Sequence, residues 1–409
     1  MKLIVIGFGQ CGGRIADEFA RLDHQARSQR GIEITPGVFA VNTDAADLSG
    51  LSTIPQDYRH RILIGSRKTG GHGVGKINEL GAEIAREDSD KIIDAIRSAK
   101  HFFEADAFLL VASTAGGTGS GSIPVMTQII KERYGGKPVY DILILPFEHE
   151  ESTEERAIFN TALCLKSVNA VANAVILVDN QRYVKKDFSL RNNLSKINRL
   201  IVEPFYDLLC AGEEKKQKYV GAKTLDAGDI INTLTGWTIL GYGKSPVSNF
   251  DWPFSKKSDF RSKSTQTHKG IQAMDEAISE MSLSCRPADA ERALYLLSAP
   301  AKEMNMDMVK ELGDYLRGIA PKATIRNGDY PRDRDTLGVH VVLSGLSNVE
   351  KIRNYYAKSV SLIPEFEKRR EERESRLRSL EEVGKGIPSL LEGKGEEPTS
   401  TSAKKDLLS

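Results

Sequence analysis

The sequence predicts an α/β fold: a parallel-sheet domain, then a long central helix, then a smaller α+β domain. Short apolar runs alternate with amphipathic stretches through the first half of the chain, and this alternation stops after Val178. Glycine-rich loops follow the first, third and fourth apolar runs. Strand, helix and strand in repetition indicate parallel strands joined by crossover helices that cover both faces of a sheet. Such sheets bind ligands beyond the carboxyl ends of their strands.

The first half contains six expected strands, with helices between them. Each strand is a short apolar run of the kind found in a sheet buried on both faces. The strands are expected at Lys2–Ile6, Gly37–Val41, Arg61–Ile64, Ala107–Ala112, Val139–Leu145 and Ala174–Val178. The helices are expected at Gly13–Leu22, Ile77–Arg86, Lys91–Arg97, Ile123–Tyr134 and Glu154–Val171.

The second half is organised differently. Apolar residues at helical spacing predict one long helix over Phe188–Cys210, and a second unit begins near Ala222. A long loop is expected over Ser245–Thr265, which carries Pro, Ser, Asn and Lys. The strands of this unit are expected at Thr238–Tyr242, Arg292–Leu297, Thr324–Arg326 and His340–Leu343, and its helices at Gly270–Met281, Met306–Gly318 and Val349–Ser361.

The last part of the chain changes in composition at Pro364. Glu365–Glu382 is nearly all Glu and Arg, with mixed signs at three- and four-residue spacing, which supports a solvated helix. The residues after it offer little apolar area to offset the entropy of ordering, so a flexible tail is expected. The expected division is an α/β domain at 1–187, a central helix and connection at 188–221, an α+β domain at 222–362, a charged helix at 363–384 and a flexible tail at 385–409.

Composition excludes several classes of protein. Among 409 residues, 57 are Lys or Arg and 56 are Asp or Glu, so the net charge of +1 lacks the basic excess of a duplex nucleic-acid binder. The four cysteines form no Cys-x-x-Cys pair, so no disulfide framework or protein-built metal site is expected. No apolar run could cross a membrane, and the apolar start is too short for a signal peptide. We expect a cytoplasmic protein that neither binds nucleic acid nor inserts into a membrane.

Two glycine loops predict a phosphate site. Gly7–Gly13 follows the first strand and reads Gly-x-Gly-x-x-Gly, a pattern that lets backbone N–H groups approach phosphate at the start of a helix. Alone, it also fits a tight turn without a ligand. Thr114–Gly121 interleaves four glycines with hydroxyl residues and opens a helix at Ile123. Its nest of N–H donors fits a di- or triphosphate better than a simple turn.

A third loop, Lys68–Gly75, follows the third strand and adds N–H groups and the cation of Lys68. By itself it equally fits a surface loop without a ligand. The first loop alone leaves a nicotinamide-dependent Rossmann oxidoreductase as one alternative. That fold needs an acidic residue about 20 residues later, at the end of the second strand, and none stands there. The second glycine loop also disfavours this alternative.

These motifs resemble those of the tubulin and FtsZ superfamily. Gly9–Gly12 (Gly-Gln-Cys-Gly) is similar to the first loop of tubulin, and Gly116–Gly121 (Gly-Gly-Thr-Gly-Ser-Gly) is similar to the superfamily signature. The stretch Gly71–Ile84 and the later Gly328–Pro331 (Gly-Asp-Tyr-Pro) look most like CetZ, the tubulin-like group of archaea. The resemblance covers roughly residues 1–360.

The resemblance implies a GTPase that assembles with copies of itself, head to tail, into protofilaments. It implies that GTP is hydrolysed only at the contact between subunits and that Mg²⁺ accompanies the nucleotide. In such proteins the first domain binds GTP or GDP and the second activates hydrolysis. The nucleotide-binding residues that the resemblance implies are Gly9, Gln10, Cys11, Gly12, Asn42, Asp44, Lys68, Gly70, Gly71, Ala115, Gly116, Gly117, Thr118, Gly119, Ser120, Gly121, Glu150, Arg156, Asn180 and Asn198.

Two asparagines match the positions that recognise the base. Asn180 matches the family asparagine near the ribose and base, and Asn198 matches the one that reads guanine from the long helix. An amide can donate and accept along the guanine edge. Without the resemblance, an ordinary surface hydrogen bond is the better explanation of either asparagine.

The ribose loop matches less cleanly, over Leu145–Arg156. Counting from Pro146 places the family glutamate at Glu150, whereas counting back from Arg156 implies an insertion of two residues. A solvated acidic helix start is the alternative interpretation, because carboxylates there favour the helix dipole.

Thr224–Asp229 matches the catalytic loop Asn-x-Asp-x-x-Asp of the family, so Asp226 and Asp229 are the predicted catalytic residues. From the residues alone, they also fit a helix N-cap followed by a first-turn acid. Thr224 stands where the family has asparagine. A GTP-binding scaffold with little hydrolysis, whose tail recruits partner proteins, is therefore the second alternative.

Overall fold

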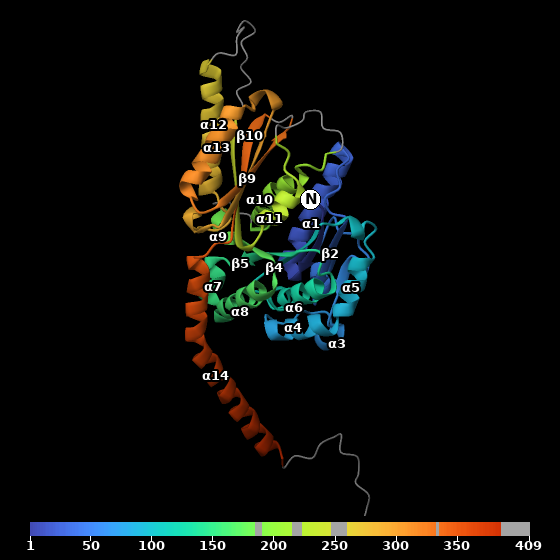
Figure 1. Cartoon of the computed structure of the whole chain (residues 1–409). Coiled ribbons are helices and arrows are strands. Elements are labelled where there is room, and N and C mark those ends of the chain that lie inside the picture. The colour runs from blue at the N-terminus through green and yellow to red at the C-terminus, as the bar shows by residue number, and fades with distance from the viewer. Residues whose placement is uncertain (185–189, 215–222, 247–259, 333–334, 386–409) are drawn as a thin grey trace, which may run out of the picture. The chain divides into compact units, whose positions relative to one another are not determined.

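The structure is a computed structural model that describes residues 1–184, 190–214, 223–246, 260–332 and 335–385. One ten-stranded sheet lies at its centre (Figure 1), in the order β3-β2-β1-β4-β5-β6-β7-β10-β8-β9. The strands are β1 (Leu3–Phe8), β2 (Gly37–Asn42), β3 (Arg61–Leu63), β4 (Ala107–Ser113), β5 (Val139–Leu145), β6 (Ala174–Asp179), β7 (Gly236–Pro246), β8 (Arg292–Ala299), β9 (Thr324–Pro331) and β10 (Thr336–Ser344). Met1–Ser359 form one compact unit that holds the whole sheet, and Val360–Ser409 form a second.

The strands from β3 to β7 pair in parallel, as the sequence predicts. Beyond β7 the sheet becomes mixed, because β10 runs antiparallel to both β7 and β8 while β9 is parallel to β8. The predicted α/β half and the smaller α+β half therefore share one continuous sheet. This confirms the predicted fold class. The pairing of β6 with β7, which connects the two halves, was not predicted.

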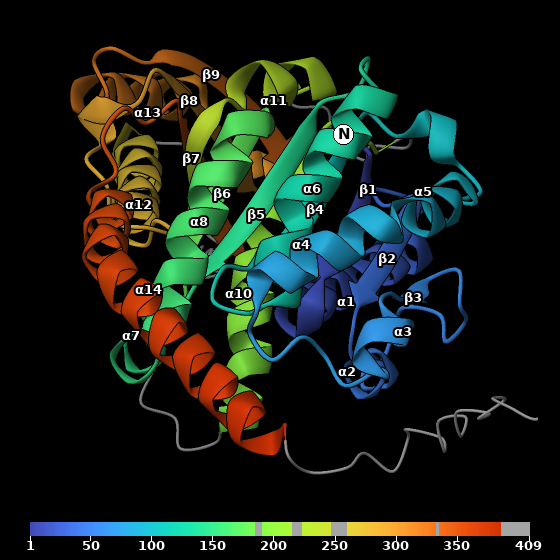
Figure 2. The same ribbon diagram turned by 90° about the horizontal axis from the view of Figure 1, so that it is seen from below.

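Helices cover both faces of the parallel strands (Figures 1 and 2). One face carries α1 (Gly9–Arg30), α2 (Ala45–Ser49), α10 (Leu190–Cys210) and α11 (Ala227–Thr233). The other carries α4 (Asn78–Glu87), α5 (Ser89–Arg97), α6 (Thr118–Arg133) and α8 (Glu155–Val171). Side chains of β1 alternate between the two cores, so Leu3 and Val5 pack towards α1 whereas Ile4 and Ile6 pack towards α6.

The second half of the sheet is covered on the α6 side by α12 (Phe260–Ser279), α13 (Met306–Ile319) and the first turns of α14 (Glu350–Gly384). The shorter helices are α3 (Ser66–Thr69), α7 (Glu148–Thr153) and α9 (Asn180–Tyr183). No helix in the described ranges is both long and apolar enough to span a bilayer.

The structure corrects several boundaries, among them the start of α6, which lies at Thr118 inside the second glycine loop rather than at Ile123. α1 begins at Gly9, inside the first glycine loop, rather than at Gly13. Both ends of the expected loop Ser245–Thr265 belong to regular elements, because β7 runs to Pro246 and α12 begins at Phe260; the residues 247–259 lie outside the described ranges. The charged helix is continuous with the helix before it through Pro364, since α14 runs from Glu350 to Gly384. The expected tail lies almost wholly outside the described residues.

Candidate nucleotide-binding site and catalytic loop

The carboxyl ends of the parallel strands meet at one edge of the sheet. Phe8 at the end of β1 pairs with Val41 of β2 and with Ala112 of β4, and Leu145 of β5 pairs with Asp179 of β6. The predicted glycine loops, ribose loop and Asn180 directly follow these strand ends. The fold therefore brings segments that are far apart in sequence to the same edge.

The first glycine loop brings α1 against the sheet and against the second loop. Gly9 has a φ of +70° and is the first residue of α1. A Cβ on Gly12 would lie 2.2 Å from the carbonyl oxygen of Val111 in β4, so only glycine permits this approach. A Cβ on Gly9 would lie 3.1 Å from the amide nitrogen of Gly119. The two predicted phosphate loops are thus in direct contact.

The second glycine loop is oriented by Asn160 of α8. The Asn160 side chain is buried, and its Nδ2 donates to the carbonyl oxygens of Ala115 at 3.1 Å and Gly116 at 3.2 Å. The Ser120 hydroxyl also donates to the Gly116 carbonyl. With these carbonyls turned into the protein, the N–H groups of the loop and the unpartnered first-turn amides of α6 can face an anion. A Cβ on Gly116 would meet no described atom within 4 Å, so the space in front of the loop is open.

Two of the predicted phosphate-binding glycines also have a packing role. A Cβ on Gly121 would lie 2.1 Å from the carbonyl oxygen of Asn78, and one on Gly117 would lie 2.8 Å from the amide nitrogen of Ile77. α4 therefore packs on α6 at a distance that side chains would prevent. This contact explains the glycines at both positions, whether or not their N–H groups also reach phosphate.

Polar groups from β2 and α2 close one side of the site. The Asp47 carboxylate accepts hydrogen bonds from Gln10 Nε2 at 2.6 Å and from Asn42 Nδ2 at 3.1 Å. The buried hydroxyls of Thr43 and Thr118 lie 2.6 Å apart. These contacts join the loop after β2 to both glycine loops and place the predicted residues Gln10, Asn42 and Thr118 together.

The third loop packs against the loop after β2. Asp44 caps α2 by accepting a hydrogen bond from the amide of Ala46 at 2.9 Å. Its main chain also forms an isolated antiparallel β-bridge with that of His72. Gly70 and Gly71 have φ values of +61° and +81°, which favour glycine. Asp44, Gly70 and Gly71 therefore lie together near the strand ends, as predicted.

Lys68 has partners that the sequence did not suggest. Its ammonium lies 2.6 Å from a carboxylate oxygen of Glu83 and 2.6 Å from one of Glu87, both on α4. A role at the terminal phosphate stays a prediction, and it requires Lys68 to exchange these carboxylates for phosphate oxygens.

The ribose loop approaches the first glycine loop through Glu150. Glu150 accepts a hydrogen bond from the amide of Phe147 at 2.9 Å and so closes the start of α7. Burial raises the pKa of the Cys11 thiol to about 12, and the charge of Glu150 adds to this increase. Cys11 is therefore a neutral, small side chain at neutral pH. Arg156 instead forms an ion pair with Glu79 of α4, so its place at the nucleotide stays a prediction.

The two asparagines predicted to read the base lie on elements that contact each other. Asn180 begins α9 at the end of β6, and Asn198 lies in α10. Both are partly exposed. Asp179 precedes Asn180, caps α9, and forms an ion pair with Lys351 of α14 at 2.7 Å.

The catalytic loop has the geometry of a capped helix start. Asp226 is the N-cap of α11 and accepts a hydrogen bond from the amide of Asp229 at 2.7 Å. Asp229 lies in the first turn and forms an ion pair with Arg326 of β9, with 3.6 Å between Asp229 Oδ1 and Arg326 Nε. Thr224 is exposed. The structure therefore contains the helix N-cap and first-turn acid of the alternative interpretation. Both carboxylates remain partly exposed to solvent.

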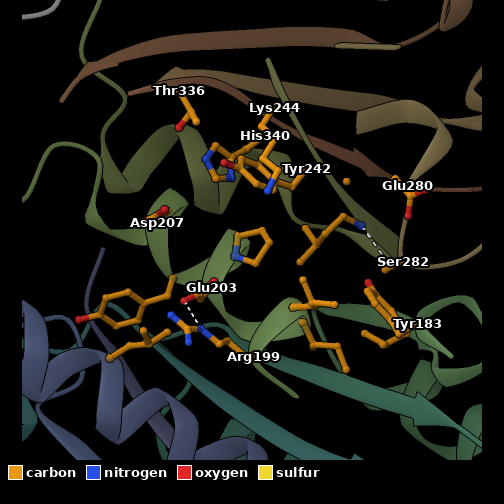
Figure 3. Close-up of a pocket in the computed structure, with 18 of the residues that line it drawn as sticks. Tyr183, Arg199, Glu203, Asp207, Tyr242, Lys244, Glu280, Ser282, Thr336 and His340 are labelled. Carbon is orange, nitrogen blue, oxygen red and sulfur yellow. Dashed lines mark hydrogen bonds and ion pairs between the residues drawn. The ribbon is translucent and has the colours of Figure 1, made fainter. Parts of the chain in front are cut away.

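A cavity of about 750 Å³ lies elsewhere, between α10 and the second half of the sheet (Figure 3). Arg199, Glu203 and Asp207 of α10 face Tyr242 of β7 and His340 of β10 across it. None of the residues predicted to bind nucleotide lines this cavity.

Comparison with known proteins matches both halves of the chain. Residues 2–186 match "Tubulin/FtsZ family, GTPase domain", and residues 187–361 match "Tubulin-like CetZ, C-terminal domain". The tubulin-like protein CetZ1 of Haloferax volcanii is 34% identical over 369 residues, which cover 86% of this chain and 90% of that protein.

Solved structures agree with this match. The GDP-bound monomer of CetZ1 from Haloferax volcanii has a TM-score of 0.75 and 32% identity, covering 88% of this chain and 99% of that one. The GTPγS-bound protofilament of CetZ2 from the same organism has a TM-score of 0.77 and 28% identity, covering 90% of this chain and 100% of that one.

The ten-stranded sheet and the paired glycine loops define a protein of the tubulin/FtsZ class. Within that class, the chain belongs to the tubulin-like CetZ family. Membership confirms the predicted resemblance and the predicted kind of protein, a cytoskeletal GTPase that polymerises. The oxidoreductase alternative has no support.

Three residues that organise the site were missed from the sequence. Asn160 orients the second glycine loop, Asp47 joins Gln10 to Asn42, and Arg326 pairs with Asp229. Each acts across a long stretch of chain and belongs to no motif by itself. Only the Gly-Asp-Tyr-Pro motif just after Arg326 gave a signal in that region.

Proposed function

We propose that this protein binds GTP at the carboxyl edge of its parallel strands and polymerises head to tail. It hydrolyses GTP where the catalytic loop of one subunit meets the nucleotide of the next. A head-to-tail contact that does not close on itself builds an open filament. The proposal is supported by the family and by the solved protofilament of a related chain.

One observation carries the nucleotide assignment. The carbonyls of Ala115 and Gly116 are bonded to Asn160, and the space in front of Gly116 is open. A loop that turns its carbonyls inward and offers N–H groups outward, at the start of a long helix, suits phosphate oxygens. Among the residues expected for a guanine nucleotide, Asn42 ends β2 and Asn180 directly follows β6.

Each part of the site has a role in this proposal. The N–H groups of Gly9–Gly12 and Ala115–Gly121 bind the phosphates, and Lys68–Gly75 approaches the terminal phosphate. Asn180 and Asn198 read guanine through hydrogen bonds to its edge. The positive N-terminal ends of α1 and α6 stabilise the phosphate charge.

The remaining predicted residues complete the pocket and supply the hydrolytic groups. Asn42, Asp44 and Glu150 line it on the side of β2 and the ribose loop. Asp226 and Asp229, from the next subunit, orient the water that attacks the terminal phosphate.

Mg²⁺ accompanies the nucleotide in this proposal. It would be held mainly by phosphate oxygens and water, as is usual for this ion. GDP occupies the same pocket after hydrolysis.

We further propose that residues 1–187 are the nucleotide-binding domain, 188–221 the connecting helix segment, and 222–362 the domain that activates hydrolysis. The protein acts in the cytoplasm, and the tail after residue 384 recruits partner proteins.

The nucleotide assignment is tested at Gly116. Gly116→Asp places a carboxylate in the open space before the loop, where it repels phosphate, while Gly116→Ser adds a small neutral group. We expect Gly116→Asp to lose binding of a fluorescent GTP analogue and Gly116→Ser to keep most of it, with equal melting temperatures. Equal binding by wild type and Gly116→Asp would contradict the assignment.

A GTP-binding scaffold with little hydrolysis is the second candidate. Thr224 in place of the family asparagine favours it. A phosphate-release assay on assembled protein separates the two candidates.

A further inference from the structure

The catalytic loop is held by β9 along most of its length. The amide of Asp329 donates to the carbonyl oxygen of Lys223 at 2.9 Å, and the amide of Lys223 donates to Asp329 Oδ1 at 2.6 Å. Lys223 Nζ also donates to Asn327 Oδ1 at 2.8 Å. Lys223, which directly precedes the catalytic loop, is therefore bonded to two residues of β9 through both its main chain and its side chain.

The middle of the loop packs on the same strand. Leu225 is fully buried, and a Cβ on Gly328 would lie 2.7 Å from Leu225 Cβ. Any side chain at residue 328 would push the loop away from the strand. Gly328 and Asp329 begin the Gly-Asp-Tyr-Pro motif, which this contact explains.

The end of the loop is held by charge. Arg326 Nε lies 3.6 Å from Asp229 Oδ1, and the two side chains are 29% and 33% exposed. Asp226 is separately fixed by its bond to the amide of Asp229. An aspartate in the first turn of an exposed helix would otherwise sample several rotamers, so the arginine selects one direction for the carboxylate.

We propose that Arg326 is a positioning residue for GTP hydrolysis, which aims the Asp229 carboxylate at the nucleotide of the neighbouring subunit. The inference rests on the proposed function. Because a misplacement of about 1 Å can lower a rate on the order of a hundredfold, loss of this contact lowers turnover without altering the nucleotide pocket. The strand β9 then holds the catalytic loop in its active position before a neighbouring subunit binds.

The opposite role is the main competing outcome. If the ion pair restrains Asp229 in the free subunit, removing the arginine raises turnover. The two roles therefore predict changes of opposite sign in one assay.

The test measures phosphate release per pelleted subunit at saturating GTP, so that a change in assembly alone does not alter the result. The variants are Arg326→Ala, Arg326→Gln and Arg326→Lys. The matched control is Arg292→Ala, because Arg292 lies on the neighbouring strand β8 and donates to the carbonyl oxygen of Asn232 in the same helix α11 at 2.7 Å. We expect turnover to fall about tenfold or more in the Ala and Gln variants.

Four further results follow from positioning. Arg326→Lys recovers part of the rate because it keeps the charge, the KM for GTP stays unchanged in every variant, and Arg292→Ala stays within about twofold of wild type. In an Asp229→Ala background, Arg326→Ala causes no additional loss, since no carboxylate remains to be aimed. Unchanged or increased turnover in Arg326→Ala and Arg326→Gln would overturn the inference.

Failure of the proposed function is recognised separately. If Asp229→Ala hydrolyses GTP normally, the shared-site mechanism itself is wrong. If Asp229→Ala is inactive while Arg326→Ala and Arg326→Gln are normal, the mechanism stands and only the role of Arg326 is wrong.

Discussion

The side-chain amide of Asn160 donates to the carbonyl oxygen of Lys76 at 2.9 Å. Lys76 has a φ of +62°, and it is the only non-glycine residue in the described ranges with a positive φ. The same amide nitrogen bonds to Ala115 and Gly116. One buried side chain therefore holds the third glycine loop and the second in a fixed relation.

Asn160→Ala is expected to weaken GTP binding. The change leaves three carbonyls without this donor, and a lost buried hydrogen-bond partner costs about 1–3 kcal/mol, so Kd should rise on the order of tenfold or more. Ser167→Ala is the control, because Ser167 is partly exposed on the same helix and its hydroxyl donates to the carbonyl of Leu163 in that helix. An unchanged Kd in Asn160→Ala, measured by titration with a fluorescent GTP analogue, would show that the loops keep their shape without it.

Guanine should be preferred over adenine because Asn180 and Asn198 each offer an amide to the base. Replacing either by Ala should reduce the ratio of GTP to ATP affinity by roughly tenfold, as expected for about 1–3 kcal/mol per lost base contact. Competition of ATP and GTP for the same fluorescent analogue gives the ratio directly. If the wild type binds both nucleotides equally, neither asparagine reads the base.

A buried acid away from the site gives a prediction about pH. Asp141 of β5 is fully buried, and both of its carboxyl oxygens lie within 3.0 Å of the Thr127 hydroxyl. Burial raises the pKa of Asp141 well above its ordinary value, although the Thr127 hydrogen bond opposes the increase. The single hydroxyl can donate to one oxygen and accept from the other only if the carboxyl is protonated.

The sign of the pH effect follows from this increase. The folded chain binds the proton more tightly than the unfolded chain does, so this group's contribution to stability falls as pH rises above the unfolded pKa of about 3.9. Asp141→Asn keeps a hydrogen-bonding group but cannot ionise. Its melting temperature should exceed that of wild type at neutral pH, and the difference should shrink as the pH approaches about 4. A difference that does not change with pH would mean that Asp141 does not titrate in this way.

The sequence predicted the parallel half of the fold well, for a physical reason. Strands such as Ala107–Ser113 are buried on both faces, so they are continuous apolar runs bounded by glycine loops. Boundaries were less predictable where tertiary contacts decide them. α1 can begin at Gly9 only because Gly12 lies directly against Val111 of β4, which no local pattern reveals.

The residues of the site were predictable where they act through the backbone. Gly9 and Gly119 stand in motifs whose geometry depends on glycine itself. Side chains that support those loops from elsewhere were not predictable, because Asn160 and Arg326 lie far along the chain from the loops they hold. The packing of Gly117 and Gly121 against α4 was likewise not predictable from the sequence.

The proposed mechanism requires that the catalytic carboxylates act on the neighbour's nucleotide. Two variants divide the shared site: Asp226→Ala/Asp229→Ala lacks the loop carboxylates, and Gly116→Asp lacks the phosphate pocket. Gly116 is preferable to Gly119 here, because a Cβ on Gly119 would press on the carbonyl oxygens of Phe8 at 3.0 Å and Ser113 at 3.2 Å. Each variant alone should be nearly inactive, and co-sedimentation checks first that the two enter the same filaments.

Phosphate release by an equal mixture of these two variants is the most direct measurement. In a head-to-tail filament the intact pocket of one variant meets the intact loop of the other at about a quarter of random contacts. We expect hydrolysis to reappear on mixing, at a fraction of the wild-type rate, and to rise with total protein concentration. Clear co-assembly without any recovered hydrolysis would place both carboxylates at their own subunit's nucleotide and contradict the shared site.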